Sequence, residues 1–150
     1  MKFGDKTLDG RVGKIRTFED GELIFDEGTI SGWIFVVAYG EVEIFRTIGD
    51  KQIILDRIYE GESLGEMSFF GQYTRSAAAR AVGQVGLLPF KDHYLLEEYD
   101  KLPNFFKVFL EAMAQRMRSL MEKVTILASN PEILELLDEE AKAEVIKKRD

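Results

Sequence analysis

The chain has 150 residues, a formal net charge of −7 at pH 7, a hydrophobic fraction of 45% and no cysteine. This length suits one domain with a real core, and the lack of cysteine excludes a disulfide framework, a thiolate nucleophile and a cysteine-based metal site. The acidic balance argues against a general nucleic-acid surface, and no apolar run reaches the roughly 18 residues that a membrane span needs.

The amino terminus is polar and lacks the apolar core of a signal peptide, so a cytoplasmic location is expected. Residues 1–10 are expected to form a loose arm. From there to residue 90, apolar residues alternate with polar ones between short turns, which predicts about eight short strands and a jelly-roll barrel. The expected strands include residues 12–18, 22–25, 33–37, 42–48, 51–59, 77–82 and 85–90.

The expected number of strands depends on two turns that contain glycine. Tyr39 and Gly40 are expected to turn residues 33–37 into a hairpin with residues 42–48, and Gly83 is expected to separate the last two strands. Gly49 and Asp50 mark a further turn.

Residues 61–79 combine small residues, a carboxylate, an arginine and a hydroxyl. The Ser63–Glu66 stretch has the form of a capping box, which predicts a short helix that begins there, runs to Phe70 and stops at Gly71. A helix N-terminus with exposed N–H groups suits a phosphate.

Four more residues of this stretch suit an anionic ligand. Gly65 lets a ligand approach the backbone, because it has no Cβ. Arg75 follows Glu66 by nine positions and can grip a phosphate with two hydrogen bonds. Ser76 can add a hydroxyl, while Ala77 leaves room. Taken singly, each has a structural alternative: Glu66 as part of the capping box and Arg75 as a surface charge.

After residue 90 the periodicity becomes helical. A short helix is expected over residues 93–99, with Asp92 as its cap, and Pro103 suits the first turn of a long helix over about residues 103–128. Its apolar stripe consists of Phe106, Phe109, Met113, Met117, Leu120, Val124 and Leu127. The stripe outruns a small barrel, so we expect it to form a homodimer interface, with a core role as the alternative. Residues 129–150 are expected to form a short helical tail.

The pattern from Gly65 to Ala77 resembles the phosphate-binding cassette of the cyclic nucleotide-binding domain family, which includes the bacterial catabolite activator and protein kinase A regulatory subunits. The framework residues Phe18, Gly21, Glu22, Glu27, Gly28, Gly40, Glu41, Val42, Gly61 and Glu62 match as well. The resemblance implies an α+β fold, an eight-stranded jelly-roll barrel with a cassette helix and C-terminal helices, over a domain of residues 1–128. The barrel would span about residues 11–90.

The resemblance also implies roles. Glu66 would accept the ribose 2′-hydroxyl, Arg75 and Ser76 would bind the cyclic phosphate, and the backbone near Gly65 and Ala77 would donate to it. The ligand would be cAMP or cGMP, with no metal and no further cofactor, and binding would move the C-terminal helices and so regulate an effector protein.

Four positions depart from the family. Leu64 replaces a phenylalanine but still fills the same hole, and Thr74 replaces a proline before the arginine. Leu120 and Met121 occupy the place of a hydroxyl pair that reads adenine, so the base is left undecided. Arg116 or Arg118 is a candidate to stack on the purine, with a solvated surface role as the alternative.

Competing functions remain at this point. About 22 residues follow Ala128, too few for the helix-turn-helix of the family's transcription factors, so DNA binding is not expected. A cassette that has lost its ligand would act as a dimerisation or docking scaffold. A cupin-like metal enzyme would need several histidines, whereas the chain has His93 alone, so no enzymatic activity is expected.

Overall fold

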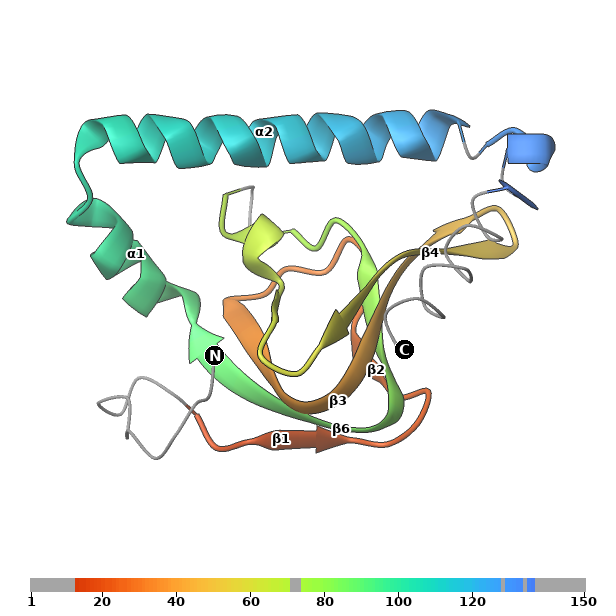
Figure 1. The fold of residues 1–150 in the computed structure, drawn as a ribbon, viewed down its shortest axis with the longest axis horizontal. Helices are drawn as coiled ribbons and strands as arrows, with labels where there is room; N and C mark the ends of the chain where they lie inside the picture. Colours follow the sequence, from red (N-terminus) through yellow and green to blue (C-terminus); the bar gives the residue numbers. More distant parts are fainter. Residues whose placement is uncertain (1–12, 71–73, 128, 134, 137–150) are drawn as a thin grey trace.

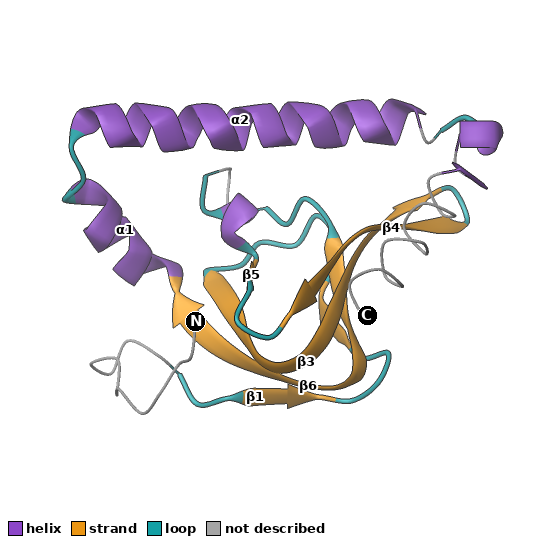
Figure 2. Ribbon diagram, in the orientation of Figure 1, coloured by secondary structure: helices purple, strands orange, loops and turns teal. Residues whose placement is uncertain are grey.

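The computed structural model describes residues 13–70, 74–127, 129–133 and 135–136. The named elements within them are six strands, one short 3₁₀ helix and two α-helices (Figures 1 and 2). The strands are β1 (Arg16–Phe18), β2 (Leu23–Phe25), β3 (Trp33–Ile48), β4 (Lys51–Tyr59), β5 (Ser63–Leu64) and β6 (Ala78–Lys91). The helices are the 3₁₀ helix Glu66–Ser68, α1 (Asp92–Asp100) and α2 (Asn104–Leu127).

All strand pairs are antiparallel, and β3 and β6 are the central partners. The sheet order is β1-β6-β3-β4, while β2 pairs with β6 and β5 pairs with β3. Figure 1 shows that these long strands curve, so that the sheet wraps around an interior. An antiparallel sheet followed by helices confirms the predicted α+β class.

The prediction of about eight strands is wrong for the described residues, because two expected turns lie inside long strands. Tyr39 and Gly40 lie within β3, and Gly83 lies within β6. The register between these strands shifts on both sides of Tyr39. Such bulges bend a strand without ending it. Residues 33–37 and 42–48 are therefore one strand rather than a hairpin, whereas the turn at Gly49 does join β3 to β4.

Gly40 shows why the bulge requires a glycine. Its φ is 92°, and a Cβ added there would lie 2.5 Å from the carbonyl oxygen of Gln84 on β6. Neither the backbone conformation nor the space admits a side chain. The glycine that predicted a turn in the sequence therefore marks a sharp bend within β3, at a place where β3 lies close to β6.

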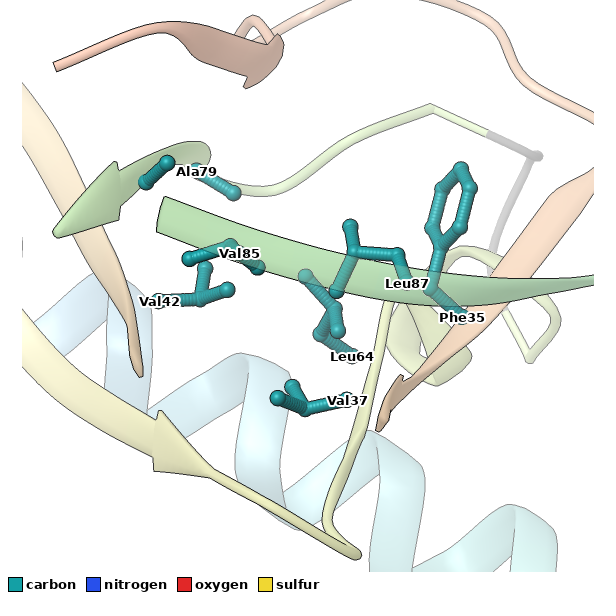
Figure 3. Close-up of a cluster of buried hydrophobic side chains, with 8 residues drawn as sticks. Phe35, Val37, Val42, Leu64, Ala79, Val85 and Leu87 are labelled. Atoms are coloured by element: carbon teal, nitrogen blue, oxygen red, sulfur yellow. The ribbon is translucent and has the colours of Figure 1, made fainter. Parts of the chain in front are cut away.

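The core lies between β3, β5 and β6. Its buried side chains are Phe35, Val37, Val42, Leu64, Ala79, Ala81, Val85 and Leu87 (Figure 3). Leu64 is 2% exposed, so the leucine does fill its position in the interior. It comes from the two-residue strand β5, which the alternation pattern did not reveal.

An ion-pair network crosses three neighbouring strands. Glu43 of β3 is cross-strand partner to both Arg57 of β4 and Arg80 of β6, and its carboxylate pairs with both guanidinium groups. Arg57 also pairs with Glu41. Glu43 is 4% exposed, so the two arginines compensate a charge that would be costly to bury alone.

The two α-helices begin close to where the sequence predicts. α1 begins at Asp92 and α2 follows Pro103, whose carbonyl accepts the Phe106 and Lys107 N–H groups. α2 crosses over the open side of the curved sheet (Figure 1). Ala114 is the buried residue of α2, whereas most of the predicted apolar stripe is exposed, with Phe109 60% and Leu120 58% accessible. The stripe is therefore not core of this chain.

Some predictions lie outside the described residues. The expected arm at residues 1–10 is one of them. The tail is described only in part: residues 131–133 and 135–136 are helical, and Asn130 Oδ1 accepts the Glu132 N–H at 3.0 Å. The domain boundary at residue 128 stays a prediction. No helix of the described residues combines the length and apolarity needed to cross a membrane.

Candidate functional site

A cavity of about 760 Å³ lies between the curved sheet and α2. One wall comes from residues 63–68 and 75–77, a second from β3 and β4, and a third from α2. Volumes of this order are usual for small-molecule sites. Figure 2 shows α2 passing over the 3₁₀ helix that forms part of the first wall.

The cavity brings together most of the predicted site residues. All five cassette residues line it: Gly65, Glu66, Arg75, Ser76 and Ala77. Leu120 and Met121 line it from α2, on the opposite side. Arg116 is exposed on α2 and is not among the described residues that line the cavity.

The local backbone differs from the predicted capping box. Ser63 and Leu64 form β5 against Val36 and Phe35 of β3, and the 3₁₀ helix begins only after Gly65. Burial of Leu64 in the core holds this segment extended, which overrides the local helix signal. The predicted helix to Phe70 is thus reduced to the three residues Glu66–Ser68. The predicted stop at Gly71 lies outside the described residues.

Gly65 makes the turn between strand and 3₁₀ helix. Its φ is 89°, a conformation that glycine adopts without strain. A Cβ at this position would lie 2.3 Å from Nη1 of Arg75. Gly65 is therefore needed both for the turn and for the space that the arginine occupies.

Arg75 is 2% exposed and bound by four acceptors from three parts of the chain. Nη1 donates to the Gly65 carbonyl and to Ser68 Oγ, each at 3.0 Å. Nη2 donates to Ser31 Oγ at 2.7 Å and to the Trp33 carbonyl. The guanidinium also lies over the Phe25 ring, 4.1 Å from its centroid. Arg75 thus ties the cassette to β2, β3 and the loop before β3.

One donor of Arg75 is left over. A guanidinium has five N–H groups, and the four on Nη1 and Nη2 are matched by the four acceptors above. Nε is buried and has no hydrogen-bond partner among the described residues. An unpaired buried donor is costly. Nε is therefore the one guanidinium N–H of Arg75 that a further acceptor could satisfy.

Burial disfavours the charged forms of the two ionisable residues in this wall, Glu66 and Arg75. It raises the pKa of Glu66 above its usual value of 4.5, although hydrogen bonding within Glu66, hydrogen bonding by Ser63 and the charge of Arg75 oppose the rise. It also lowers the pKa of Arg75, with Glu66 acting against the change. Each residue stabilises the charge of the other across a partly desolvated site.

The rest of the cavity is mainly apolar. On the β3 and β4 wall it is lined by aliphatic side chains such as Ile44, Ile53 and Leu55, and on the α2 wall by Met117, Leu120, Met121 and Val124. Leu55 lies where the register between β3 and β4 shifts, a bulge beside the cavity. The site therefore joins one charged end to one apolar end.

Polar side chains attach α2 to the rest of the domain. Arg118 Nη1 donates to the Phe70 carbonyl at 2.6 Å, next to the cassette. Arg46 of β3 donates from Nη1 to Thr125 Oγ1 at 2.6 Å and pairs with Glu27 at 2.7 Å. In the sequence, Arg118 lies among the cavity-lining residues of α2 and Thr125 directly follows the last of them, so both contacts hold the part of the helix that lines the cavity.

An aromatic cluster links the cassette to α1. The Phe69 and Phe70 rings contact Tyr99 edge-on, with centroids 5.9 Å and 6.0 Å away. The Tyr99 hydroxyl donates to Glu111 of α2, and this hydrogen bond raises the pKa of Tyr99 to about 12. The cassette, α1 and α2 are thereby in direct contact.

Sequence reasoning missed the partners of Arg75. Ser31 and Ser68 lie 44 and 7 positions away, and Phe25 and the Trp33 carbonyl come from separate strands. Ser68 had a local signal, because it belongs to the same polar stretch. Ser31 and Phe25 had none, since long-range pairing places them. Within the described part of the chain, no group of three or more potential metal ligands is present.

Comparison with known proteins identifies relatives of this architecture. The sequence profile of the cyclic nucleotide-binding domain matches residues 15–101. A cyclic AMP receptor protein from Thermus thermophilus is 32% identical over 115 residues, which cover 75% of this chain and 53% of the relative. A lysophospholipase from Neosartorya fischeri is 27% identical over 104 residues, 69% of this chain and 7% of that enzyme. The chain thus spans about half of the first relative and a small part of the second.

Solved structures agree. The cAMP-bound EAL enzyme Bd1971 superposes with a TM-score of 0.68 at 25% identity, covering 75% of this chain and 31% of that one. Its cGMP-bound form gives 0.67 at 26% identity, with 70% and 28% covered. The Thermus thermophilus catabolite activator protein gives 0.59 at 30% identity, with 77% and 55% covered. The sequence profile and the Thermus thermophilus relative show the family: this chain belongs to the cyclic nucleotide-binding domain family.

Proposed function

We propose that this domain is a regulatory receptor that binds cAMP or cGMP in the cavity between the sheet and α2. The observation that carries the proposal is the buried, unpaired Nε of Arg75, in a residue that lines the cavity beside Ser76 and Ala77. A cyclic phosphate is an anion whose oxygens can accept a charge-assisted hydrogen bond from an arginine and a further bond from a serine hydroxyl. The bound nucleotides of the solved relatives give this ligand class further support.

The remaining cassette residues have complementary roles in this proposal. Glu66 accepts a ribose hydroxyl, which offsets the cost of its burial, and the backbone near Gly65 and Ala77 approaches the phosphate closely. The purine extends toward Leu120 and Met121 of α2. No step is catalytic, in keeping with a family defined by ligand binding.

Contact between the ligand and α2 couples binding to helix position. The ligand touches the cassette on one side and α2 on the other, and Arg118 already joins the two. A ligand that contacts α2 in only one arrangement of the helix favours that arrangement. The part of the exposed α2 stripe that does not line the cavity, which includes Phe109 and Met113, would be buried in a homodimer. An effector protein would respond to the changed position of α2.

Isothermal titration with cAMP and with cGMP tests the proposal, with 5′-AMP as the control for a non-cyclic phosphate. Arg75→Lys keeps the charge and loses the planar fork, so its affinity should fall by at least about tenfold, since loss of a charged hydrogen bond costs roughly 1.5–3 kcal/mol. Arg116→Ala removes an exposed arginine outside the cavity and should leave affinity unchanged.

Absence of binding by both cyclic nucleotides, in a sample with a sharp thermal transition, would reject the receptor and favour a dimerisation or docking scaffold. A separate measurement tests the coupling between nucleotide binding and the position of α2. Amide hydrogen exchange of α2 should slow when nucleotide is added, and unchanged exchange in a saturated sample would reject the coupling while leaving the binding intact.

A further inference from the structure

The two ends of the cavity offer a ligand different chemistry. Glu66, Arg75 and Ser76 supply charge and hydrogen bonds at one end. The wall from α2 at the other end consists of Met117, Leu120, Met121 and Val124, whose side chains hold no conventional hydrogen-bond donor and no strong acceptor. The chemistry that could distinguish ligands is therefore concentrated at one end.

The backbone of α2 adds nothing to the second wall. These four residues lie within the helix Asn104–Leu127, where N–H and C=O groups are paired along the helix. Thr125, the next hydroxyl along, donates to the Met121 carbonyl at 2.8 Å and accepts from Arg46 at 2.6 Å. A base that reaches α2 meets apolar surface.

Two polar side chains of the other walls, Asp56 and Ser68, are already hydrogen-bonded within the protein. Asp56 Oδ1 accepts the Arg57 N–H at 2.8 Å, and the charge of Asp56 acts on Glu66. Ser68 Oγ donates to the Gly65 carbonyl at 2.6 Å and accepts from Arg75. These groups serve the end of the cavity that we assign to phosphate and ribose.

We propose that this site recognises the cyclic ribose phosphate and holds the purine by shape and apolar contact alone, so that it accepts both cAMP and cGMP. The inference rests on the proposed function of the same cavity. Adenine and guanine share the same fused-ring frame and differ in the donors and acceptors of their edges, with one additional exocyclic amino group on guanine. An apolar pocket separates polar variants of one shape by about 100-fold at most, whereas a site built to hydrogen-bond one of them reaches 10⁴–10⁵-fold, on the order seen in well-studied enzymes.

The test is titration of the intact chain with cAMP, cGMP and the inosine analogue cIMP under one buffer condition. We expect three dissociation constants within about 100-fold of one another. Binding of one nucleotide more than about 100-fold tighter than the others would overturn this inference and leave the receptor function standing. Binding of none would reject the receptor function itself, so the two failures are distinguishable.

A variant pair tests the apolar wall. Leu120 is 58% exposed, so Leu120→Ala should fold normally, which a thermal melt checks. The variant should weaken the binding of cAMP and of cGMP by the same factor, so that the ratio of the two dissociation constants stays unchanged. Leu127→Ala is the matched control, since Leu127 is 53% exposed on the same helix and does not line the cavity. A change of more than about tenfold in the cAMP-to-cGMP ratio of Leu120→Ala would contradict recognition without base-edge hydrogen bonds.

Discussion

Replacement of Arg75 by alanine separates two views of this residue. The sequence alone suggests an arginine that lines a pocket and contributes little to the core, so that Arg75→Ala abolishes phosphate binding and leaves the fold intact. The structure places Arg75 at 2% exposure with four hydrogen bonds and a contact with the Phe25 ring. We therefore expect the variant to lose stability as well as ligand.

The size of the loss follows from the groups left behind. Four acceptors lose a charged donor, but water can enter the cavity beside them, and the cost of burying the guanidinium is removed. The net destabilisation should be about 2–4 kcal/mol, in the upper part of the usual range for single substitutions. For a domain of this size, that corresponds to a fall in Tm of about 5–15 °C.

Thermal unfolding followed by circular dichroism, in the absence of nucleotide, measures this change. Arg116→Ala is the matched control, because it removes an exposed arginine and should leave Tm within about 1 °C of the parent chain. A Tm for Arg75→Ala equally close to the parent would refute the structural role. It would mean that the four hydrogen bonds give no net stabilisation over solvation of the same groups.

Two further predictions concern the same wall. Gly65→Ala should cost about 1–2 kcal/mol from strain at positive φ and, because its Cβ would lie 2.3 Å from Arg75 Nη1, should also weaken cAMP binding. Gly49→Ala, also at positive φ but with nothing within 4 Å, should show the strain alone, and equal cAMP affinity in both variants would contradict the steric argument. Glu66→Gln tests the raised pKa: a carboxyl that binds its proton more tightly when folded stabilises the fold below its usual pKa of 4.5, and this stabilisation is lost as pH rises through the folded pKa. The Tm of Glu66→Gln minus the Tm of the parent should therefore increase between about pH 4 and about pH 7. A constant difference across that range would show that the pKa of Glu66 is not raised in the folded chain.

Several elements could be predicted because their causes are local. Pro103 marks the start of α2, Gly49 and Asp50 turn β3 into β4, and alternation of apolar residues identifies most of β4. The residues that line the charged end of the cavity, Glu66 and Arg75, were identified by their spacing. In each case a few neighbouring residues contain the information.

The remaining features depend on contacts between distant segments. Gly40 looks like a turn, and its role as a bulge is decided by the backbone of Gln84 on another strand. Ser63 and Leu64 look like a helix start, and pairing with β3 makes them a strand. Ser31 binds Arg75 across 44 positions of the chain. Such pairings arise from the folded sheet, and no local pattern indicates them.

Among the described residues, few contacts attach α2 to the rest of the domain, and this affects how often the helix is displaced from its position over the cavity. The helix contributes one buried residue, Ala114, and its polar contacts with the rest of the described domain involve Arg118, Arg46, Glu111 and Lys107. With net values of about 1 kcal/mol for each hydrogen bond, displacement of the helix costs on the order of a few kcal/mol. On this estimate we expect displaced forms at roughly 0.1–10% without any ligand, and a difference of about 5.5 kcal/mol in ligand affinity between the two positions would take a 1:99 mixture to 99:1. The same helix that lines the cavity is therefore one whose position takes little free energy to change.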